Sequence, residues 1–600
     1  MAQVTTFGRH LLNNVLPEGH RIEAQTGKKA LNQVMTELAQ KDPHAYVHTI
    51  AELKKVGDKL ATLEGLSVGL DDIEPDYKAR DAALKPHFDR FQAATNDEKR
   101  RDIVEAAQVD VLKHVTSHPG TMTQQVRSGA RGNAIQYMKI VGSPVYARNA
   151  AGKTEPWMIR RAYGEGLKSS DYWVAGNEAI LDTIKSTVSV SEPGELAKIL
   201  VSNMQNIIIT EDDCGTHNGI LMSTDSTDVV DRYLARDIGG FKRGTLVTPA
   251  VQSKLAKLQE KVLVRSPMTC EAGDGVCQKC QGLDEKGQIH VHGTNVGVRA
   301  AQAMSEPLTQ FALNAKHGVR TAKDDRIQVH GVQGFRQIIQ TPHQFINKAT
   351  LAEQDGKVTK VEVAPQGGHY VYIGDRQHYI SPNLGVTVAV GQTIERGDGL
   401  SQGIPKPDEV VSHKGLAAGR LYVVNTLKDL YKSQGHDLDS RHFELLARGE
   451  MNHVHILDDP SGNFLKGDVV SYNHLRSELK RGVKTLPVDD ALGETLGQEY
   501  FHYSAGMRVT PPMVKFLKGQ KITEVVTAPR APQVQFIMKP ATTAPLLDPD
   551  WMARLAHRDL KSSVLQAAHF GETTDLHGTS PVPAYALSSP EFGKGPKGRY

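Results

Sequence analysis

The sequence predicts a multidomain α+β fold that is mainly helical. The chain has 600 residues, of which 39% are hydrophobic and 23% charged, a composition typical of a globular protein with several domains. Residues 1–115 carry helical periodicity, as in NDEKRRDIVEAAQVDVLKHV. After residue 345 the pattern changes to short alternating runs such as KVTKVEVAP and HYVYIGD, which predict a small β-rich, barrel-like domain up to about residue 410.

Helical patterns return in three further segments. Residues 180–209 predict a long helix, which Pro193 and Gly194 must break or kink unless they lie in its first turn. Residues 416–450 and 540–575 also favour helix. The chain then ends in SSPEFGKGPKGRY, a composition typical of a flexible tail.

Charge and hydropathy limit the classes of function. The sequence contains no N-terminal apolar run and no stretch of eighteen apolar residues, so it predicts neither a signal peptide nor a membrane partner, and we expect a cytosolic protein. The net charge is only +3, but residues 119–170 hold eight Lys or Arg against two Glu. This basic segment is a candidate for contact with phosphates.

The four cysteines of the chain are placed one plus three. Three of them lie in CEAGDGVCQKC and the other in ITEDDCGTHNGI; they are Cys214, Cys270, Cys277 and Cys280. This distribution favours a four-cysteine zinc site over disulfides. Two alternatives stay open from the residues alone: a redox or incidental C-x-x-C with Cys214 as a buried apolar residue, or a site in which His290 or His292 replaces one cysteine.

The stretch SEPLTQFALNAKHGV, residues 305–319, predicts a helix with Pro307 in its first turn and Gly318 as its stop. Its spacing aligns amide and imidazole side chains on one face, with one leucine beside them: Gln310, Leu313, Asn314 and His317. A merely solvated face is the alternative. A histidine can transfer a proton near pH 7, and amides can bind sugar hydroxyls or phosphate oxygens, so the pattern favours a nucleotide.

Four long motifs in a fixed order resemble the beta-prime subunit of bacterial multisubunit RNA polymerase. They are VRSGARGNAIQ, ITEDDCGTHNGI, VRSPMTCEAGDGVCQKCQG and VGVRAAQAMSEPLTQFALNAKHGV. Other segments, among them TTFGRHLLNNVLP, FLKGDVVSY and HFGETT, resemble beta-prime segments in the same order. The resemblance extends over nearly the whole chain.

The resemblance implies a role for each candidate residue. Cys214, Cys270, Cys277 and Cys280 match the ligands of a structural zinc ion. In this family a trigger loop folds over the incoming nucleoside triphosphate: Gln310 and Asn314 match ribose or phosphate contacts, Leu313 packs under the base, and His317 reaches the phosphates. Arg131 and Gln136 match the floor of the cleft near the channel through which nucleotides enter.

The resemblance also implies an order of regions along the chain. Residues 1–118 resemble rim and funnel helices, 119–177 a basic segment of the cleft floor, and 178–213 the bridge helix. Residues 214–290 resemble the zinc segment, 291–342 the trigger helices and loop, and 343–412 a small β domain. Residues 413–600 resemble a C-terminal region associated with the cleft and clamp, with a flexible tail.

Some positions depart from the family pattern. Lys316 stands where an aromatic residue is usual, and Leu308 stands where a small one is usual. The region resembling the bridge helix carries about three extra residues, so 182–193 receive no catalytic role. A long insertion found in bacterial trigger loops is absent, since HGVQGFRQII follows soon after His317.

Polymerases of this family hold Mg²⁺ with an Asp-x-Asp-x-Asp loop. The chain contains Asp437-Leu-Asp439 and Asp548-Pro-Asp550 but no such triple. We therefore expect Mg²⁺ in the assembled active site, with its ligands on another chain, and no activity from this chain alone. Its initiator methionine suggests a naturally split subunit, as in the RNA polymerases of giant (jumbo) bacteriophages.

The expected partners follow from this interpretation. They are an N-terminal beta-prime-like chain with the aspartate loop, beta-like chains, template DNA, the RNA transcript and nucleoside triphosphates, in the cytoplasm of an infected bacterial cell. The alternative is a non-catalytic, polymerase-derived zinc scaffold or a decoy that binds a host polymerase. The retained face of Gln310, Leu313, Asn314 and His317 argues against that alternative, because a scaffold has no physical reason to keep it.

Overall fold

The computed structural model describes most of the chain. The described residues are 6–23, 27–64, 68–74, 77–117, 120–149, 153–187, 191–258, 261–273, 275–314, 331–548, 550–555, 560–574, 576 and 579–582. The predicted flexible tail, residues 588–600, lies outside them. The chain divides into two compact units, Met1–Ile184 and Lys185–Tyr600.

The first unit is built from helices, as predicted for residues 1–115. They are α1 (Phe7–Val15), α2 (Lys28–Lys41), α3 (Pro43–Glu64), α4 (Tyr77–Ala93), α5 (Asp97–Ser117), α6 (Thr121–Ser128), α7 (Ala134–Val141) and α8 (Ser169–Thr187), whose last residues pass the unit boundary. Val104, Ala107 and Val111 of α5 are fully buried and form a core with Leu84 of α4 and Met138 of α7. Their spacing places the three α5 side chains on one helix face.

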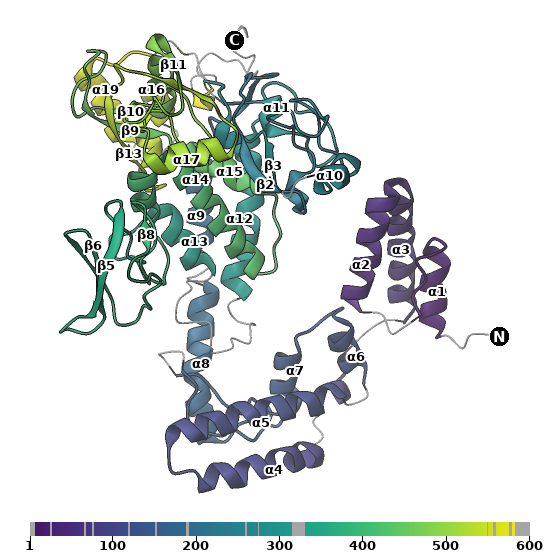
Figure 1. Cartoon of the computed structure of the whole chain (residues 1–600). Helices are drawn as coiled ribbons and strands as arrows, with labels where there is room; N and C mark the ends of the chain where they lie inside the picture. The colour runs from purple at the N-terminus through teal and green to yellow at the C-terminus, as the bar shows by residue number, and fades with distance from the viewer. Residues whose placement is uncertain are drawn as a thin grey trace. The chain divides into compact units, whose positions relative to one another are not determined.

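The second unit contains a group of packed helices and several small helices around them. They are α9 (Ser191–Met204), α10 (Pro249–Ala256), α11 (Gln278–Gln281), α12 (Val296–Asn314), α13 (Gly331–Gln340), α14 (Pro407–Ser433), α15 (Ser440–Glu450), α16 (Tyr472–Leu479), α17 (Pro511–Gly519), α18 (Trp551–Arg554) and α19 (Leu560–Phe570). Helices α9, α12, α13, α14 and α15 lie side by side (Figure 1).

Small sheets surround these helices. The alternating runs after residue 345 form the antiparallel sheet β7-β6-β5-β8, made of β5 (Gly356–Val363), β6 (His369–Ile373), β7 (Arg376–Ile380) and β8 (Thr393–Ile394). The other pairs are β1 (Ile209–Glu211) with β4 (Val276–Cys277), β2 (Ile220–Ser223) with β3 (Lys261–Val264), and β11 (Lys484–Pro487) with β12 (Glu524–Thr527); β10 (Val469–Ser471), β9 (His453–Asp458) and β13 (Gln533–Ile537) form a sheet of three. The fold is thus mixed α+β and mostly helical, as predicted.

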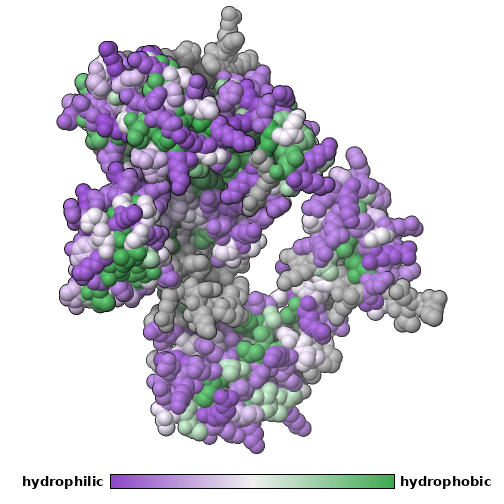
Figure 2. Space-filling view, viewed as in Figure 1, coloured by the Kyte–Doolittle hydropathy of each residue, from purple (hydrophilic) through white to green (hydrophobic). Residues whose placement is uncertain are grey.

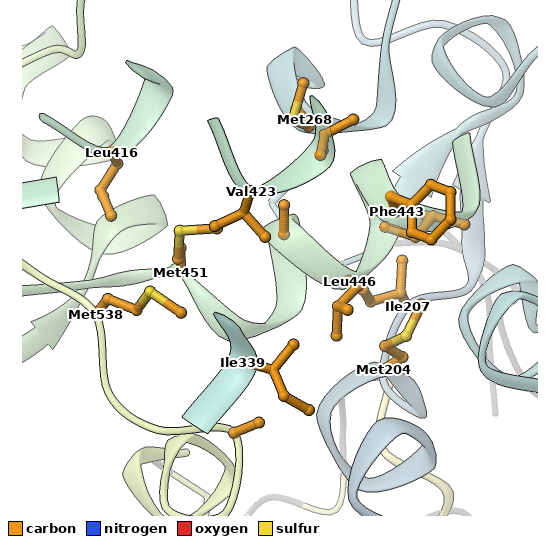
Figure 3. Packing of buried hydrophobic residues seen from close by; sticks show 14 of the residues in the cluster. Met204, Ile207, Met268, Ile339, Leu416, Val423, Phe443, Leu446, Met451 and Met538 are labelled. Atoms are coloured by element: carbon orange, nitrogen blue, oxygen red, sulfur yellow. The ribbon is translucent and has the colours of Figure 1, made fainter. Parts of the chain in front are cut away.

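The main core of the second unit joins segments that are far apart in the sequence. Figure 3 shows Met204, the last residue of α9, and Ile207, which follows the helix, beside Phe443 and Leu446 of α15. Elsewhere in the same view Val423 of α14 lies near Met451. These side chains are almost completely buried, so the apolar area that they remove from water stabilises the contact between α9, α14 and α15.

Two prolines test the helix predictions. Pro193 lies in the first turn of α9, the position in which a proline is tolerated, as the sequence allowed. The prediction for Pro307 was wrong, because this residue lies inside α12, which begins at Val296 rather than near residue 305. A proline inside a helix leaves a preceding carbonyl without its amide partner. For Pro307 that carbonyl belongs to Ala303. The hydroxyl of Tyr431 donates to the carbonyl of the next residue, Met304, 2.8 Å away.

One supersecondary unit occurs twice in the second unit of the chain. We name residues 231–265 the first copy and residues 493–528 the second copy. Their sequences LARDIGGFKRGTLVTP and LGQEYFHYSAGMRVTP share the leucine, the glycine and the final Val-Thr-Pro at equal spacing. Each copy closes a tight hairpin, continues into a helix that starts at the proline (α10 or α17), and ends in a strand (β3 or β12).

The backbone hydrogen bonds of the two copies correspond. Gly244 donates to the Leu234 carbonyl as Gly506 donates to the Leu496 carbonyl. The corresponding bridges are Ile238–Phe241 with Tyr500–Tyr503, and Tyr233–Leu246 with Thr495–Arg508. The two copies also share one apolar core, in which Ala235 and Leu263 of the first copy pack with Leu496 and Leu517 of the second.

The surface is polar over most of the face shown in Figure 2, where purple, hydrophilic residues outnumber green ones. Within the described ranges, no helix combines the length and the apolar character needed to cross a membrane.

Candidate metal centre

The structure brings the four cysteines together. The sulfur atoms of Cys214, Cys270, Cys277 and Cys280 all lie within 4.8 Å of one another, and those of Cys214 and Cys280 are 3.7 Å apart. Zinc–thiolate bonds in a tetrahedron place two sulfurs roughly 3.8 Å apart. All four thiols are free rather than paired in disulfides, so this donor set fits zinc, and it fills every position of a tetrahedral ion.

Local turns aim the thiols at one point. Cys214 follows β1, Cys270 follows a short 3₁₀ turn at Pro267–Thr269, and Cys277 caps α11, which carries Cys280. Backbone amides point at the sulfurs: Glu271 donates to Cys214, Cys277 donates to Cys270, and Cys280 donates to Cys277, each at 3.3 Å. Such bonds stabilise the thiolate form, which is the form that binds a metal.

The turn before Cys277 depends on a glycine. Gly275 has a φ of +73°, and a Cβ at this position would lie 2.3 Å from the Ile208 carbonyl oxygen. Strands β1 and β4 can therefore pair in parallel, Ile209 with Val276, only with glycine here. This pairing brings the loop of Cys214 next to the other three cysteines.

An arginine lies directly against the thiols. Arg265 is 1% exposed; its Nε lies 3.2 Å from the Cys280 sulfur, and its Nη2 lies 3.3 Å from that of Cys214. Nη2 also donates to Asp213 at 2.8 Å. Four thiolates around one Zn²⁺ would carry a net negative charge in the protein interior, and the positive charge of Arg265 would compensate part of it.

The charges of this centre are coupled. Hydrogen bonds from the other three thiols, Cys270 first, lower the pKa of Cys214 far below its ordinary value. Burial opposes the charge of Arg265, but the thiolates of Cys280 and Cys214 outweigh it and raise its pKa. Burial likewise opposes the charge of Asp213, yet hydrogen bonds from the Gly215 amide, Arg265 and Lys279 lower its pKa to about 2. Burial in contrast raises the pKa of Cys270 and Cys280. The protein alone therefore favours the thiolate form at Cys214, and a bound metal would be needed to hold all four cysteines as thiolates.

Two further buried arginines anchor this centre to α15. Arg448 donates to the carbonyls of Pro267 and Cys270, at 3.1 and 2.9 Å, and to that of Ala272 at 3.0 Å. Arg232 of the first copy makes two hydrogen bonds to Glu444, of 2.9 and 2.6 Å, and both side chains are fully buried. The partners are far apart in the sequence, so no local pattern predicted these contacts.

The histidine alternative is not supported by the geometry. Nε2 of His292 lies 2.9 Å from Oδ1 of Asp212, and the cluster that the structure brings together consists of the four cysteines. His290 is buried, and burial lowers its pKa.

The predicted nucleotide face lies only partly within the described residues. Gln310 is exposed on α12 and donates a hydrogen bond to Glu306. Leu313 and Asn314 are the last but one and the last residues of α12, but their side chains lie outside the described residues, as does His317 altogether. The common face of these four residues stays a prediction.

The predicted residues of the cleft floor lie in the first unit. Arg131 and Gln136 are both exposed, Arg131 in the turn after α6 and Gln136 in the first turn of α7. Asn133 caps α7, its side-chain oxygen accepting from the amides of Ile135 and Gln136. Their role at the floor of a cleft stays a prediction.

Comparisons with known proteins show similarity over the segment that contains the cysteine cluster. Residues 166–462 match the family model described as RNA polymerase Rpb1, domain 5. This match contains all four cysteines and α12. The chain is also similar to proteins named DNA-directed RNA polymerase subunit beta' from three bacteria. It is 27% identical over 524 residues to that of Acidothermus cellulolyticus, 28% over 532 residues to that of Streptomyces avermitilis, and 29% over 526 residues to that of a Parafrankia species.

The chain is distantly similar to RNA polymerase beta-prime subunits. Each of these alignments covers 80% of this chain, and the chain spans 40% of the length of the curated relatives. The beta-prime resemblance seen in the motifs is thereby confirmed.

Proposed function

We propose that this chain is the C-terminal, beta-prime-like part of a multisubunit DNA-dependent RNA polymerase. The observation that carries the proposal is the collinear similarity to beta-prime subunits over 80% of the chain. The buried four-cysteine cluster agrees with this proposal. Four cysteine ligands would close a zinc site and leave no open position for water, which fits a structural role and argues against a stand-alone zinc enzyme.

In this proposal the segment around residues 178–213 acts as the bridge helix and residues 291–342 as the trigger helices and loop. The support is positional: α12 follows the zinc segment directly and leads to Gln310, Leu313, Asn314 and His317. His317 would donate a proton or hydrogen bond to the phosphates during nucleotide addition, while Gln310 and Asn314 orient the ribose and phosphates. Arg131 and Gln136 would line the path of the nucleotide.

The proposal places the magnesium ligands on a separate chain. The sequence contains no Asp-x-Asp-x-Asp. Mg²⁺ held by such a loop would stabilise the charge that develops on the transferred phosphates. The proposed partners are a beta-prime-like chain with this loop, beta-like chains, template DNA and RNA, and the proposed source is a giant bacteriophage with a split subunit.

The first experiment is a pull-down of the tagged chain from cells that produce it, followed by template-dependent RNA synthesis in the eluate. We expect a partner chain with the aspartate loop, and RNA synthesis. Recovery with an intact host polymerase, without added activity, would instead favour the scaffold or decoy.

The active complex then tests the trigger assignment. We expect His317→Ala to slow single-nucleotide addition about 100-fold, the usual contribution of a positioned acid–base group, without loss of assembly. His292→Ala is the matched control, because His292 is half-exposed and lies beside the zinc segment. An unchanged addition rate in His317→Ala would contradict the assignment.

A further inference from the structure

The two copies of the repeated unit differ at the tip of their hairpin. Gly239 of the first copy has a φ of +54°, and Phe501 at the matching position of the second copy has a φ of +55°. The left-handed region suits glycine but strains a bulky residue by about 1–3 kcal/mol. The Phe501 amide donates to Oδ1 of Asn218 at 2.9 Å, which helps to hold this conformation. Strain of this kind is often retained where a side chain serves a function.

Phe501 forms a wall of a cavity. The cavity has a volume of about 240 Å³ and lies between the second copy, β2 and α14. Its apolar lining includes Ile220 and Leu221 of β2, Leu421 of α14, and the ring of Phe516. The rings of Phe501 and Phe516 meet edge to face with centroids 5.5 Å apart. An apolar cavity of roughly 150 Å³ is large enough to bind benzene.

One buried polar atom of the lining has no partner. Glu499 is 8% exposed, and its Oε1 accepts no hydrogen bond from the described residues. The matching residue of the first copy, Asp237, is in contrast exposed and accepts from Lys242 and the Arg243 amide. A buried carboxylate oxygen without a donor costs free energy, so its retention points to a donor that a ligand supplies.

The ligand does not need a positive charge. Arg420, which is 2% exposed and also lines the cavity, attracts Glu499 electrostatically, as does Arg476. Arg420 itself is engaged, since it donates to the carbonyls of Met451 and Met268. The Tyr472 hydroxyl is also a hydrogen-bond partner of this carboxylate. The carboxylate is thus balanced in charge, and only its Oε1 lacks a donor.

We propose that this cavity binds a small, neutral aromatic molecule whose N–H or O–H group donates to Oε1 of Glu499. The aromatic body would pack between Leu421 and the rings of Phe501 and Phe516. Molecules of the size of indole or phenol meet both requirements. The site belongs to the second copy, because the first copy has Gly239 at the position of the aromatic wall and an exposed, paired Asp237 at that of the carboxylate.

Calorimetric titration of the full, zinc-loaded chain with indole tests this proposal, with benzofuran as a ligand of nearly the same shape that lacks the N–H. We expect saturable binding of indole and binding of benzofuran that is about tenfold weaker, as for the loss of one hydrogen bond to a charged group. Absence of saturable indole binding would overturn the proposal. Equal affinities for the two ligands would overturn the role of Glu499.

Three variants locate the site. Leu421→Trp fills the cavity and should abolish indole binding. Glu499→Gln replaces the charged acceptor by a neutral one of the same shape and should weaken binding about tenfold. Asp237→Asn makes the matching change in the first copy and should leave binding unchanged. If Leu421→Trp fails to fold in a thermal melt, the contrast between Glu499→Gln and Asp237→Asn decides, and equal affinities in those two variants contradict the proposed site.

Discussion

The first and second copies of the repeated unit share one backbone pattern but treat buried charge differently. Arg232 and Arg265 of the first copy are buried and bonded to Glu444 and to the thiols. The second copy has Glu494 and Ala528 at the matching positions, and its buried carboxylate has an unpaired oxygen. The two copies share the glycine at Gly244 or Gly506 and the Val-Thr-Pro at the helix start, and they have the same backbone pattern. The few positions at which their side chains differ decide whether a copy supports the metal centre or lines the cavity.

The largest effect should come from removing a metal ligand of the centre that the first copy supports. We expect Cys214→Ser to lose zinc and to unfold at a much lower temperature, because the metal-binding free energy contributes directly to folding. Zinc per chain and the thermal unfolding midpoint are the measurements. Ala528→Ser introduces the same hydroxyl at a buried position of the second copy, so it should lower the unfolding midpoint slightly and leave the zinc content unchanged. Full zinc occupancy in Cys214→Ser would remove this residue from the site.

The ion pair of the first copy should come next. Glu444→Gln leaves Arg232 fully buried without its carboxylate, and breaking such a pair costs about 3–5 kcal/mol. The control is Glu494→Gln, at the position of the second copy that corresponds to Arg232, which should change stability by less than about 0.5 kcal/mol. Urea unfolding measures both. If the two variants lost similar amounts of stability, the buried ion pair of Arg232 with Glu444 would not distinguish the two copies.

The third prediction concerns Glu450, which lies on α15 like Glu444 but, unlike Glu444, has no arginine partner among the described residues. Glu450 is fully buried, neither of its oxygens has a partner among the described residues, and burial raises its pKa well above the ordinary value. The folded state therefore holds a proton that the unfolded state releases at lower pH. Stability is retained below pH 4.5 and decreases as pH rises toward the raised folded pKa, by about 1.4 kcal/mol per pH unit.

Glu450→Gln should remove this decrease, so that the variant becomes the more stable protein at neutral pH. Unfolding free energies measured from pH 5 to 8 in both proteins provide the test. Parallel profiles would indicate that Glu450 is paired in the folded protein.

The smallest effect should come from the hairpin tips. Gly239→Ala places a Cβ at a φ of +54° and 2.3 Å from Cδ1 of Leu258, and we expect a loss of about 1–2 kcal/mol. Gly519→Ala, a glycine without positive φ and with nothing within 4 Å of the new Cβ, is the control and should be neutral or slightly stabilising. Thermal melts compare them. If Gly239→Ala lost no more stability than Gly519→Ala, the positive φ of Gly239 would impose no cost on a side chain, and the contrast with Phe501 would fail.

The sequence predicted the features that depend on local spacing and composition. The alternating runs after residue 345 form a sheet, the helical patterns form helices, and the one-plus-three cysteines converge. The helix around Pro307 was misjudged because α12 already begins at Val296, so Pro307 lies inside the helix and the local preference of proline for a first turn does not mark its start.

Other features depend on contacts between distant segments or on weak internal similarity. The salt bridge of Arg232 with Glu444 joins residues that only the folded chain brings together. The two copies of the repeated unit share few identical residues. Their correspondence lies mainly in the backbone hydrogen bonds. The signal that could have found them earlier is the recurrence of Val-Thr-Pro after a leucine and a glycine at equal spacing.

The three hydrogen bonds of Arg448 have a consequence for the chain in solution. They join the loop of Cys270 to α15, and α15 packs in the main core. Metal binding and core formation are therefore linked by mass action: each tenfold rise in free zinc above the dissociation constant favours the folded chain by about 1.4 kcal/mol. The supply of zinc would then set how much of this chain is folded.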